Sequence, residues 1–535
     1  MADGLTTGML VEEIPGDEEA IGLSPGGFTA FIGATARGPV HQPVPVNSVE
    51  TFRRTFGRLD GSDPLAETLE DFFTCGGDTA LVVRVVNGAR SCSLVLRAGS
   101  AALILHAVSP GDREWLRASV DYDHIDPQDS MGFNLVVQRL RVPGTERVEE
   151  QEIFNGLSVD PSSDRFVADA LASSGLVRVR GRVPPVRPDA TVGQGVMRPV
   201  SWVEASRDGR RGQQLTDYDL IGSAQNGAGL FALDQAPRLD FLCLPPRPDG
   251  SGAGPALLLA AMRYCRHRAA MLVIDPPADC DSPKRIFDYI GDANLAGPNA
   301  MIAFPGLERA GMDGMRPNSG AVAGALARHD HRHGVWVSDG ERPAVLATGL
   351  RPFLTLDGET CRRLTAQGIN VLTRSSGGRL GLYGDTTLAG RDAPVAGGHS
   401  LSERRLYLRI HDTLSWGTRW AVFSRPGPAI WRRLTVHLND LMGRLFGMGA
   451  FGEQPVEDAY FVRCDARTNR AEDPDICFVV GYAMRPGRPY TVVHVRQSVA
   501  GATVTPISMD RYRILSGDWQ AGQRLREADS LAGHG

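Results

Sequence analysis

The stretch FIGATARGPV, residues 31–40, ends an apolar run and carries two glycines, Gly33 and Gly38, separated by four residues. This is the glycine spacing of a phosphate-binding loop, which also needs Lys and then Ser or Thr directly after the second glycine. Pro39 and Val40 stand in those places, and proline has no N–H to offer a phosphate. We therefore predict no nucleotide site and interpret the stretch as a strand and turn whose glycines serve backbone geometry.

The composition is that of a globular protein. The chain has 535 residues, 42% of them hydrophobic and 22% charged, with a formal net charge of −5. This length allows about three or four domains, and the charge gives no basic field for nucleic acid. No apolar run approaches the ~18 residues of a membrane span. The acidic start MADGLTTGMLVEEIPGDEEA lacks the apolar region of a signal peptide, so we expect synthesis inside the cell and no membrane insertion.

Two sets of side chains suggest metal or disulfide chemistry and are interpreted otherwise. The eight cysteines are scattered without a Cys-x-x-Cys pair, which predicts buried thiols and no disulfide framework. His329, His331 and His333 lie in RHDHRHG (328–334), where the spacing could place two imidazoles on one helix face. Flanking arginines and Gly334 favour an ordinary cationic helix end. No metal and no cofactor are therefore predicted.

The N-terminal part of the chain predicts an extended arm and then a compact α/β unit. Residues 8–16, GMLVEEIPG, form a β-prone piece followed by an acidic, Gly-rich connector. In the unit, Ser48 begins one predicted helix and Gly76 ends another. The expected elements are strands at 28–35 and 79–86 and helices at 48–57 and 63–77.

The middle of the chain has two patterns. Short alternating runs over residues 91–200 predict a strand-rich insertion with one helix at 164–172. Its expected strands are 102–108, 116–122, 133–140 and 176–183. Residues 225–385 alternate strands and helices, which predicts a parallel sheet with helices on its faces. Here the expected strands are 238–245, 269–277, 299–306 and 369–374, and the expected helices are 254–267, 282–292, 320–329 and 357–367.

Residues 400–497 have the strongest pattern. Ser400 is predicted as a helix N-cap. In the segment from Pro428 to Gly449, apolar residues recur every three or four positions and predict one buried helix face: Trp431, Leu434, Leu438, Leu441 and Leu445. Strands are expected at 459–465, 476–484 and 490–497, and the polar residues 498–535 are predicted to be a tail.

Six segments in this order resemble one protein family. They are FIGATARGPVHQPVPVNSVETFRRTFG (31–57), FFTCGGDTALVVRVV (72–86), NGLSVDPSSDRFV (155–167), NSGAVAGALARHDHRHGVW (318–336), LTAQGINVLTR (364–374) and RRLYLRIHDTLSWGTRWAVF (404–423). The pattern is similar to that of the contractile tail sheath family, which includes phage tail sheath proteins and the sheaths of tailocins and extracellular contractile injection systems. The resemblance covers the chain from about residue 9 to about residue 497.

The resemblance implies an α/β and α+β multidomain fold: a conserved sheath core with a subtilisin-like parallel-sheet domain, a β-rich insertion domain and extended terminal arms. The expected parts are an N-terminal arm (1–22), the N-terminal part of the sheath core (23–90), the insertion domain (91–200), the subtilisin-like domain (201–385), a C-terminal core domain (386–497) and a C-terminal tail (498–535).

The implied function is structural. Copies of the chain would form hexameric rings stacked helically around an inner tube, together with a baseplate and a tail terminator or cap. Contraction of this sheath would drive the tube through a target cell envelope, using changed subunit contacts rather than nucleotide hydrolysis. The particle would be assembled in the bacterial cytoplasm as a virion tail or a phage-tail-like particle. The sequence leaves open whether it is a phage, a tailocin or an injection system.

The alternative function is a subtilisin-fold hydrolase with an accessory N-terminal domain. Ser319 opens a predicted helix, as a nucleophile would, and Asp240 is a candidate acid. A catalytic triad also needs a histidine base oriented by the acid. The histidine between the two, His267, lies within a predicted helix among arginines, so no catalytic residue is assigned.

Two sets of residues are predicted to contact other subunits. The first is a pair of arm strands, in which residues 8–14 of one subunit pair with the region 490–497 of others. Its residues are Met9, Leu10, Val11, Ile14, Val492, Val493 and Val495. The second set is Arg404, Arg405 and Arg409, for which two interpretations stay open. They form either a solvated helix face or a basic face that lines the sheath interior against an acidic tube.

Overall fold

In the computed structural model of the protein, the chain divides into two units. The larger unit contains residues 27–332 and 342–390, and the smaller contains residues 1–26, 333–341 and 391–535. The structure describes residues 21–23, 26–59, 63–191, 201–236, 238–309, 314–338, 342–375, 377–389, 400–424, 427–470 and 473–517.

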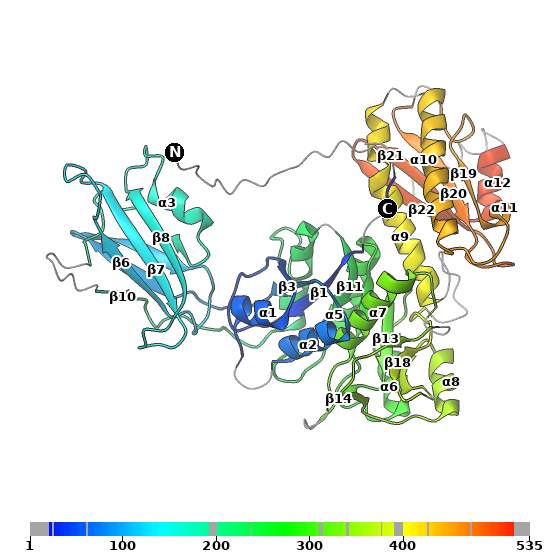
Figure 1. The fold of residues 1–535 in the computed structure, drawn as a ribbon, viewed down its shortest axis with the longest axis horizontal. Helices are drawn as coiled ribbons and strands as arrows, with labels where there is room; N and C mark the ends of the chain where they lie inside the picture. Colours follow the sequence, from blue (N-terminus) through cyan, green and yellow to red (C-terminus); the bar gives the residue numbers. More distant parts are fainter. Residues whose placement is uncertain are drawn as a thin grey trace. The chain divides into compact units, whose positions relative to one another are not determined.

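A nine-stranded sheet forms the centre of the larger unit (Figure 1). In spatial order its strands are β15 (Ala344–Val345), β18 (Leu380–Tyr383), β17 (Asn370–Arg374), β13 (Ala300–Phe304), β12 (Met271–Ile274), β11 (Leu239–Cys243), β1 (Phe28–Gly33), β3 (Ala80–Arg84) and β2 (Val44–Val46). The strands from β17 to β3 run parallel, and antiparallel strands close both ends. The predicted parallel sheet is confirmed, and it also includes the N-terminal strands β1 and β3.

Helices cover this sheet where the sequence predicts them. The predicted ones are α1 (Val49–Phe56), α2 (Pro64–Cys75), α5 (Pro255–His267), α6 (Pro283–Asp292), α7 (Ser319–His333) and α8 (Gly358–Ala366). The shorter α4 (Asp217–Ile221) and η2 (Gly229–Gln235) were not predicted. The hydroxyl of Ser48 accepts a hydrogen bond from the N–H of Thr51, and left-handed Gly76 ends α2. Helix α2 packs against β1, and α5 packs against β12. A separate ribbon of β14 (Leu307–Arg309) and β16 (Leu350–Pro352) completes this part.

The insertion forms two antiparallel sheets with a hydrophobic core of their own. One sheet has the order β10 (Val203–Glu204), β6 (Leu116–Asp121), β7 (Gly132–Leu140), β8 (Val148–Ser158), and the other has β4 (Ser93–Ala98), β5 (Ala101–Ala107), β9 (Val177–Val179). A short helical segment, α3 (Val167–Ala170) and η1 (Leu171–Ser173), lies between β8 and β9. The sequence missed β4, β8 and β10, and β10 joins a sheet of the insertion although it lies beyond the expected boundary at residue 200. Strand β8 is an edge strand with mostly exposed residues, and three of its eleven residues are glutamates, so it lacks the alternation that identifies a half-buried strand.

The smaller unit combines helices and an antiparallel sheet. Its elements are α9 (Leu401–Gly417), η3 (Arg419–Phe423), α10 (Pro428–Gly447), α11 (Val456–Ala459), β19 (Tyr460–Arg463), β20 (Ile476–Tyr482), β21 (Thr491–Ser498), β22 (Gly501–Ile507) and α12 (Met509–Gly517). The predicted apolar face of α10 is buried. The predicted tail is wrong for its first part, because β22 continues the sheet and α12 follows it. Strand β22 is an edge strand whose side chains are half-buried or exposed, so it lacks the apolar pattern of a buried strand.

The opening glycines play different roles. Gly38 has φ of 105°, and a Cβ on it would lie 2.6 Å from Cδ1 of Phe56. Gly33 ends β1 without a positive φ, and a Cβ there would meet Leu65 at an ordinary 3.7 Å. The geometric interpretation of the loop therefore applies to Gly38, and Gly33 has no comparable need to be glycine.

We expect Gly38→Ala to lower the free energy of unfolding of the larger unit by about 1–3 kcal/mol or more, since it combines backbone strain with a clash. Gly33→Ala is the matched control, and it should stay within about 1 kcal/mol of the unmodified protein. Urea unfolding measures both. Equal stability of the two variants would contradict this account of the loop.

Candidate functional site

Strand β21 contains three of the predicted arm residues, and it lies inside its sheet. It pairs antiparallel with β20 on one side and with β22 on the other. Val492, Val493 and Val495 are buried at 0–1% exposure and belong to the core of the smaller unit. An incoming strand cannot pair with β21, because both of its backbone edges are occupied. Within the described chain β21 thus offers no free edge, and the pairing of residues 8–14 with the region 490–497 of other subunits stays a prediction.

Strand β22 is the available edge next to it. It ends the sheet order β19-β20-β21-β22 in the described part of the chain. Its sequence, GATVTPI, has no charged residue, and its side chains are half-buried or exposed. Charged side chains usually protect an exposed edge strand from pairing with another strand. In β22 only Pro506 has such an effect, since it removes one backbone N–H donor. Strand β22 can therefore accept another strand. Met9, Leu10, Val11 and Ile14 lie outside the described residues.

Helix α9 carries the three predicted arginines. Ser400 begins it with a capping box, in which the Ser400 hydroxyl accepts from the N–H of Glu403. Arg404 and Arg405 are buried, at 7% and 8% exposure, and Arg409 is half-buried. The Arg404 guanidinium stacks 4.6 Å from the ring centre of Tyr407. Arg404 thus packs on a ring of its own helix, and Arg405 is also buried, which neither interpretation of an exposed basic face anticipated.

Ser319, the candidate nucleophile, lies at the start of α7 and is buried. Its hydroxyl donates to Oδ2 of Asp275 at 2.6 Å. The N–H groups of Asn318 and Ser319 both donate to Oδ1 of Asp275 at 2.7 Å. Asp275 directly follows β12, at the carboxyl edge of the sheet, where α/β proteins place their sites. Here the carboxylate caps a helix and accepts the hydrogen bond of the Ser319 hydroxyl.

The other two triad candidates do not join Ser319. Asp240 lies on β11, where it accepts from the N–H of Gly27 and pairs with Arg238. His267 is exposed at the end of α5. In the described residues, the hydrogen bonds of Ser319 thus lead to Asp275 rather than to a histidine base, so this cluster is suited to structure rather than to acyl transfer.

Burial controls the chemistry of the remaining candidates. Seven of the eight cysteines are buried and Cys361 is half-buried, which confirms the interpretation of the thiols as core residues. Burial raises the pKa of Cys75 to about 11.

Within the described part of the chain, no three His, Cys, Asp or Glu side chains gather as metal ligands. None of the helices in that part is long and apolar enough to cross a membrane.

The chain is structurally similar to known sheath proteins. The sheath tail protein of Listeria innocua aligns with a TM-score of 0.57 over 92% of this chain and 97% of its own, at 14% identity. The sheath tail protein of Desulfitobacterium hafniense aligns with a TM-score of 0.52 over 89% and 98%, at 13% identity. A contracted sheath complex from the extracellular contractile injection system PVC gives a TM-score of 0.47 over 90% and 95%, at 13% identity.

The first two similarities show that this chain has the fold of the sheath tail proteins along nearly all of its length. The sequence itself matches no protein-family model, and it matches no curated protein. The fold is thus recognised in three dimensions, and a mixed α/β multidomain architecture is confirmed.

The Asp275 cluster makes stability depend on pH. Desolvation raises the pKa of Asp275 to about 6, although the bonds from Ser319 and Asn318 lower it. The folded state therefore holds this proton more tightly than the unfolded chain, and its stabilisation is present near pH 4 and lost as the pH rises through 6. From pH 7 to pH 4.5, the unmodified protein should gain about 2 kcal/mol of unfolding free energy relative to Asp275→Asn.

Urea unfolding of both proteins at the two pH values measures this difference. Asp357→Asn serves as a control of opposite sign. The N–H of Thr360 lowers the pKa of Asp357, so the stabilisation from Asp357 is lost as the pH falls. A difference between the unmodified protein and Asp275→Asn that is independent of pH would refute the assignment.

Proposed function

We propose that this chain is the structural subunit of a contractile tail sheath, which polymerises around an inner tube and contracts to drive the tube through a cell envelope. The observation that carries the proposal is the fold similarity to two sheath tail proteins over nearly the whole of both chains. The uncharged edge of β22 supports it, because a polymer whose subunits exchange strands needs such an edge.

The proposal includes an assembly and its parts. Subunits would form hexameric rings stacked helically, with an inner tube, a baseplate and a terminator or cap as partners. Assembly would take place in the bacterial cytoplasm, for a virion tail or a related particle. The nine-stranded sheet would be the subtilisin-like core, with residues 23–90 and 201–385 as its two parts, residues 91–200 as the insertion domain and residues 386–497 as the C-terminal core domain. The hydroxyl of Ser319 is hydrogen-bonded to Asp275, which gives no support to the hydrolase alternative.

The arm is proposed to add to β22 rather than to β21. Residues 8–14 of one copy would pair with the edge formed by residues 501–507 of another, which would satisfy the backbone groups of both strands. Such a link lets neighbours stay connected while the larger interfaces rearrange.

Electron microscopy of the full-length protein should show rings or tubes, whereas a hydrolase would give discrete monomers. Deleting residues 1–20 should leave a soluble, folded protein that forms no stable tubes. The double variant Thr503→Lys, Thr505→Lys should have the same effect, because charges at exposed positions block an edge.

Asn439→Lys is the matched control for the charge, since this residue is exposed on α10 away from the edge. It should form tubes as the full-length protein does. Normal tubes from the deletion, or from the β22 double variant, would refute the arm model. Monomers from the full-length protein at all concentrations would count against the sheath itself.

The tube-facing role is proposed for α9, with Arg409 as the arginine to test. Reversing Arg404 or Arg405 would bury an acid and test folding instead. A part-exposed pair with an acidic tube residue contributes about 0.2–1 kcal/mol, so repetition along the tube must supply the affinity.

We expect Arg409→Glu to reduce the amount of protein that cosediments with purified tubes, and Arg432→Glu, at an exposed site on α10, to leave it unchanged. Circular dichroism checks that both variants are folded. Normal coating of tubes by folded Arg409→Glu at physiological salt would remove Arg409 from the tube contact.

A further inference from the structure

The insertion and the central sheet have separate hydrophobic cores. One cluster of buried residues contains Ile32, Val83 and Leu242 of the central sheet. A second cluster contains residues of the insertion such as Leu105 and Leu135, and the two clusters share no member. Hydrogen bonds from Arg37, Arg84 and Arg113 join the two parts. Domains that meet through small polar interfaces generally move relative to one another unless something holds them.

The chain enters and leaves the insertion through a paired neck. Arg90 and Arg210 exchange backbone hydrogen bonds of 2.9 and 3.0 Å, and the N–H of Gln213 donates to the carbonyl of Asn87. The two segments approach closely, since a Cβ on Gly212 would lie 2.1 Å from the oxygen of Asn87. The neck attaches the insertion to the core at one place. Other contacts must therefore fix the orientation of the insertion about that place.

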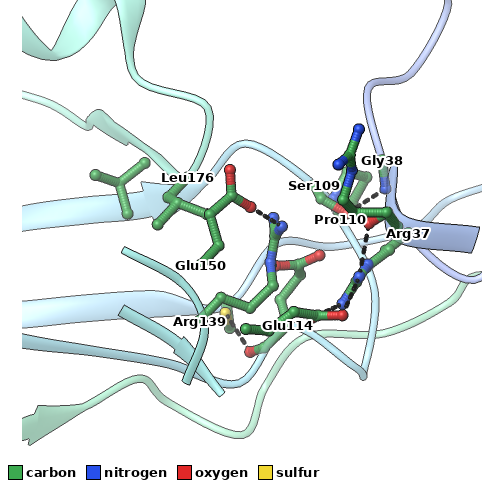
Figure 2. A network of polar contacts seen from close by, with 12 residues as sticks. Arg37, Gly38, Ser109, Pro110, Glu114, Arg139, Glu150 and Leu176 are labelled. Carbon is green, nitrogen blue, oxygen red and sulfur yellow. Dashed lines mark hydrogen bonds and ion pairs between the residues drawn. The ribbon is translucent and has the colours of Figure 1, made fainter. Parts of the chain in front are cut away.

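Arg84, at the end of β3, binds the segment Ser109–Pro110 of the insertion next to the neck. Its side chain is buried, and its guanidinium donates to the carbonyl of Gly38 at 2.7 Å and to the carbonyl of Pro110 at 2.6 Å. Ser109 accepts from Arg84 and from the N–H of Gly38 (Figure 2). Burial lowers the pKa of Arg84 to about 10, so the group stays charged at neutral pH. These bonds hold two backbone segments together next to the neck.

A second contact lies away from the neck, on the edge strand β8. The Arg37 guanidinium forms two hydrogen bonds to Glu149, at 2.5 and 2.8 Å, and a third to the carbonyl of Arg54. The side chains are 9% and 26% exposed. Desolvation would raise the pKa of Glu149, but the bond and charge of Arg37 hold it below its usual range. This fork geometry fixes orientation as well as distance.

Further charged groups of both signs surround this contact. Next to Glu149, Glu150 accepts from Arg139 at 2.5 Å, and Arg139 also donates to buried Glu114 at 3.0 Å (Figure 2). Glu114, Glu149 and Glu150 thus lie near Arg37, and Arg139 and Arg141 lie near Glu149. Because only the Arg37–Glu149 pair in this network joins a core loop to β8, its loss would leave the bonds within the insertion intact.

We propose that the Arg37–Glu149 pair is a latch that holds residues 91–209 in one orientation on the core, with the neck as the hinge. Without the latch, the insertion moves as a rigid body while both hydrophobic cores stay folded. This inference does not depend on the sheath proposal.

Electron–electron double resonance between spin labels on the unassembled full-length protein tests the latch. Labels are placed at Glu50→Cys on α1 and Asp164→Cys in the insertion, both exposed, in a Cys361→Ser background, since the other cysteines are buried. The unmodified pair should give one narrow distance distribution. Glu149→Ala should broaden it, and Arg37→Lys, which keeps the charge but loses the fork, should have an intermediate effect.

Glu146→Ala is the matched control, because Glu146 forms a similar two-bond pair with Arg117 wholly within the insertion. It should keep the narrow distribution. Hydrogen exchange at the amides of Arg90 and Arg210 should stay slow in all variants, which separates unlatching from opening of the neck. An unchanged distribution in Glu149→Ala, or equal broadening in Glu146→Ala, would overturn the proposal.

Discussion

The pairing of β1 with two partners is the interaction on which the rest of the structure depends. Thr29, Ala30 and Phe31 pair with β11 on one side and with β3 on the other. Residues 30–32 are at most 1% exposed, so this strand is buried on both faces as well as on both edges. Without β1 the nine-stranded sheet would separate into two sheets with two unpaired edges. The loop after β1 then carries Arg37 and Gly38 to the insertion, and Arg84 reaches the same place from β3.

Features set by neighbouring residues could be predicted from the sequence. The capping residues Ser48 and Ser400, the terminator Gly76 and the apolar face of α10 all act within one or two helical turns. Strands buried on both faces were also recognisable, because they are short apolar runs. Edge strands β8 and β22 were missed, since an exposed strand needs no alternation of its own. The union of residues 23–90 with 201–385 in one sheet depends on long-range pairing, which local patterns do not encode.

The candidate site was less predictable, because its side chains act across the sequence. The sequence around Ser319 suggests a possible nucleophile, but the role of Ser319 is set by Asp275, which is 44 residues away. The charges of Arg404 and Arg405 suggest solvent exposure, yet both side chains are buried. Asp71 shows the same principle, since this buried carboxylate on α2 accepts from both Arg309 and Arg316. Arginine here is repeatedly a packing residue with a fixed fork of donors.

The paired neck has a consequence for how the chain reaches its native state. The sheet must join Thr29 to Phe241 across the whole insertion, and closing so long a loop costs conformational entropy and slows folding. The insertion has a core of its own, and its contacts are mostly between strands close in sequence. If it folds first, the ladder between Asn87–Arg90 and Arg210–Gln213 brings the flanking segments together. The loop that must close to pair β1 with β11 is then effectively much shorter. The insertion and its paired neck would thus speed the folding of the central sheet.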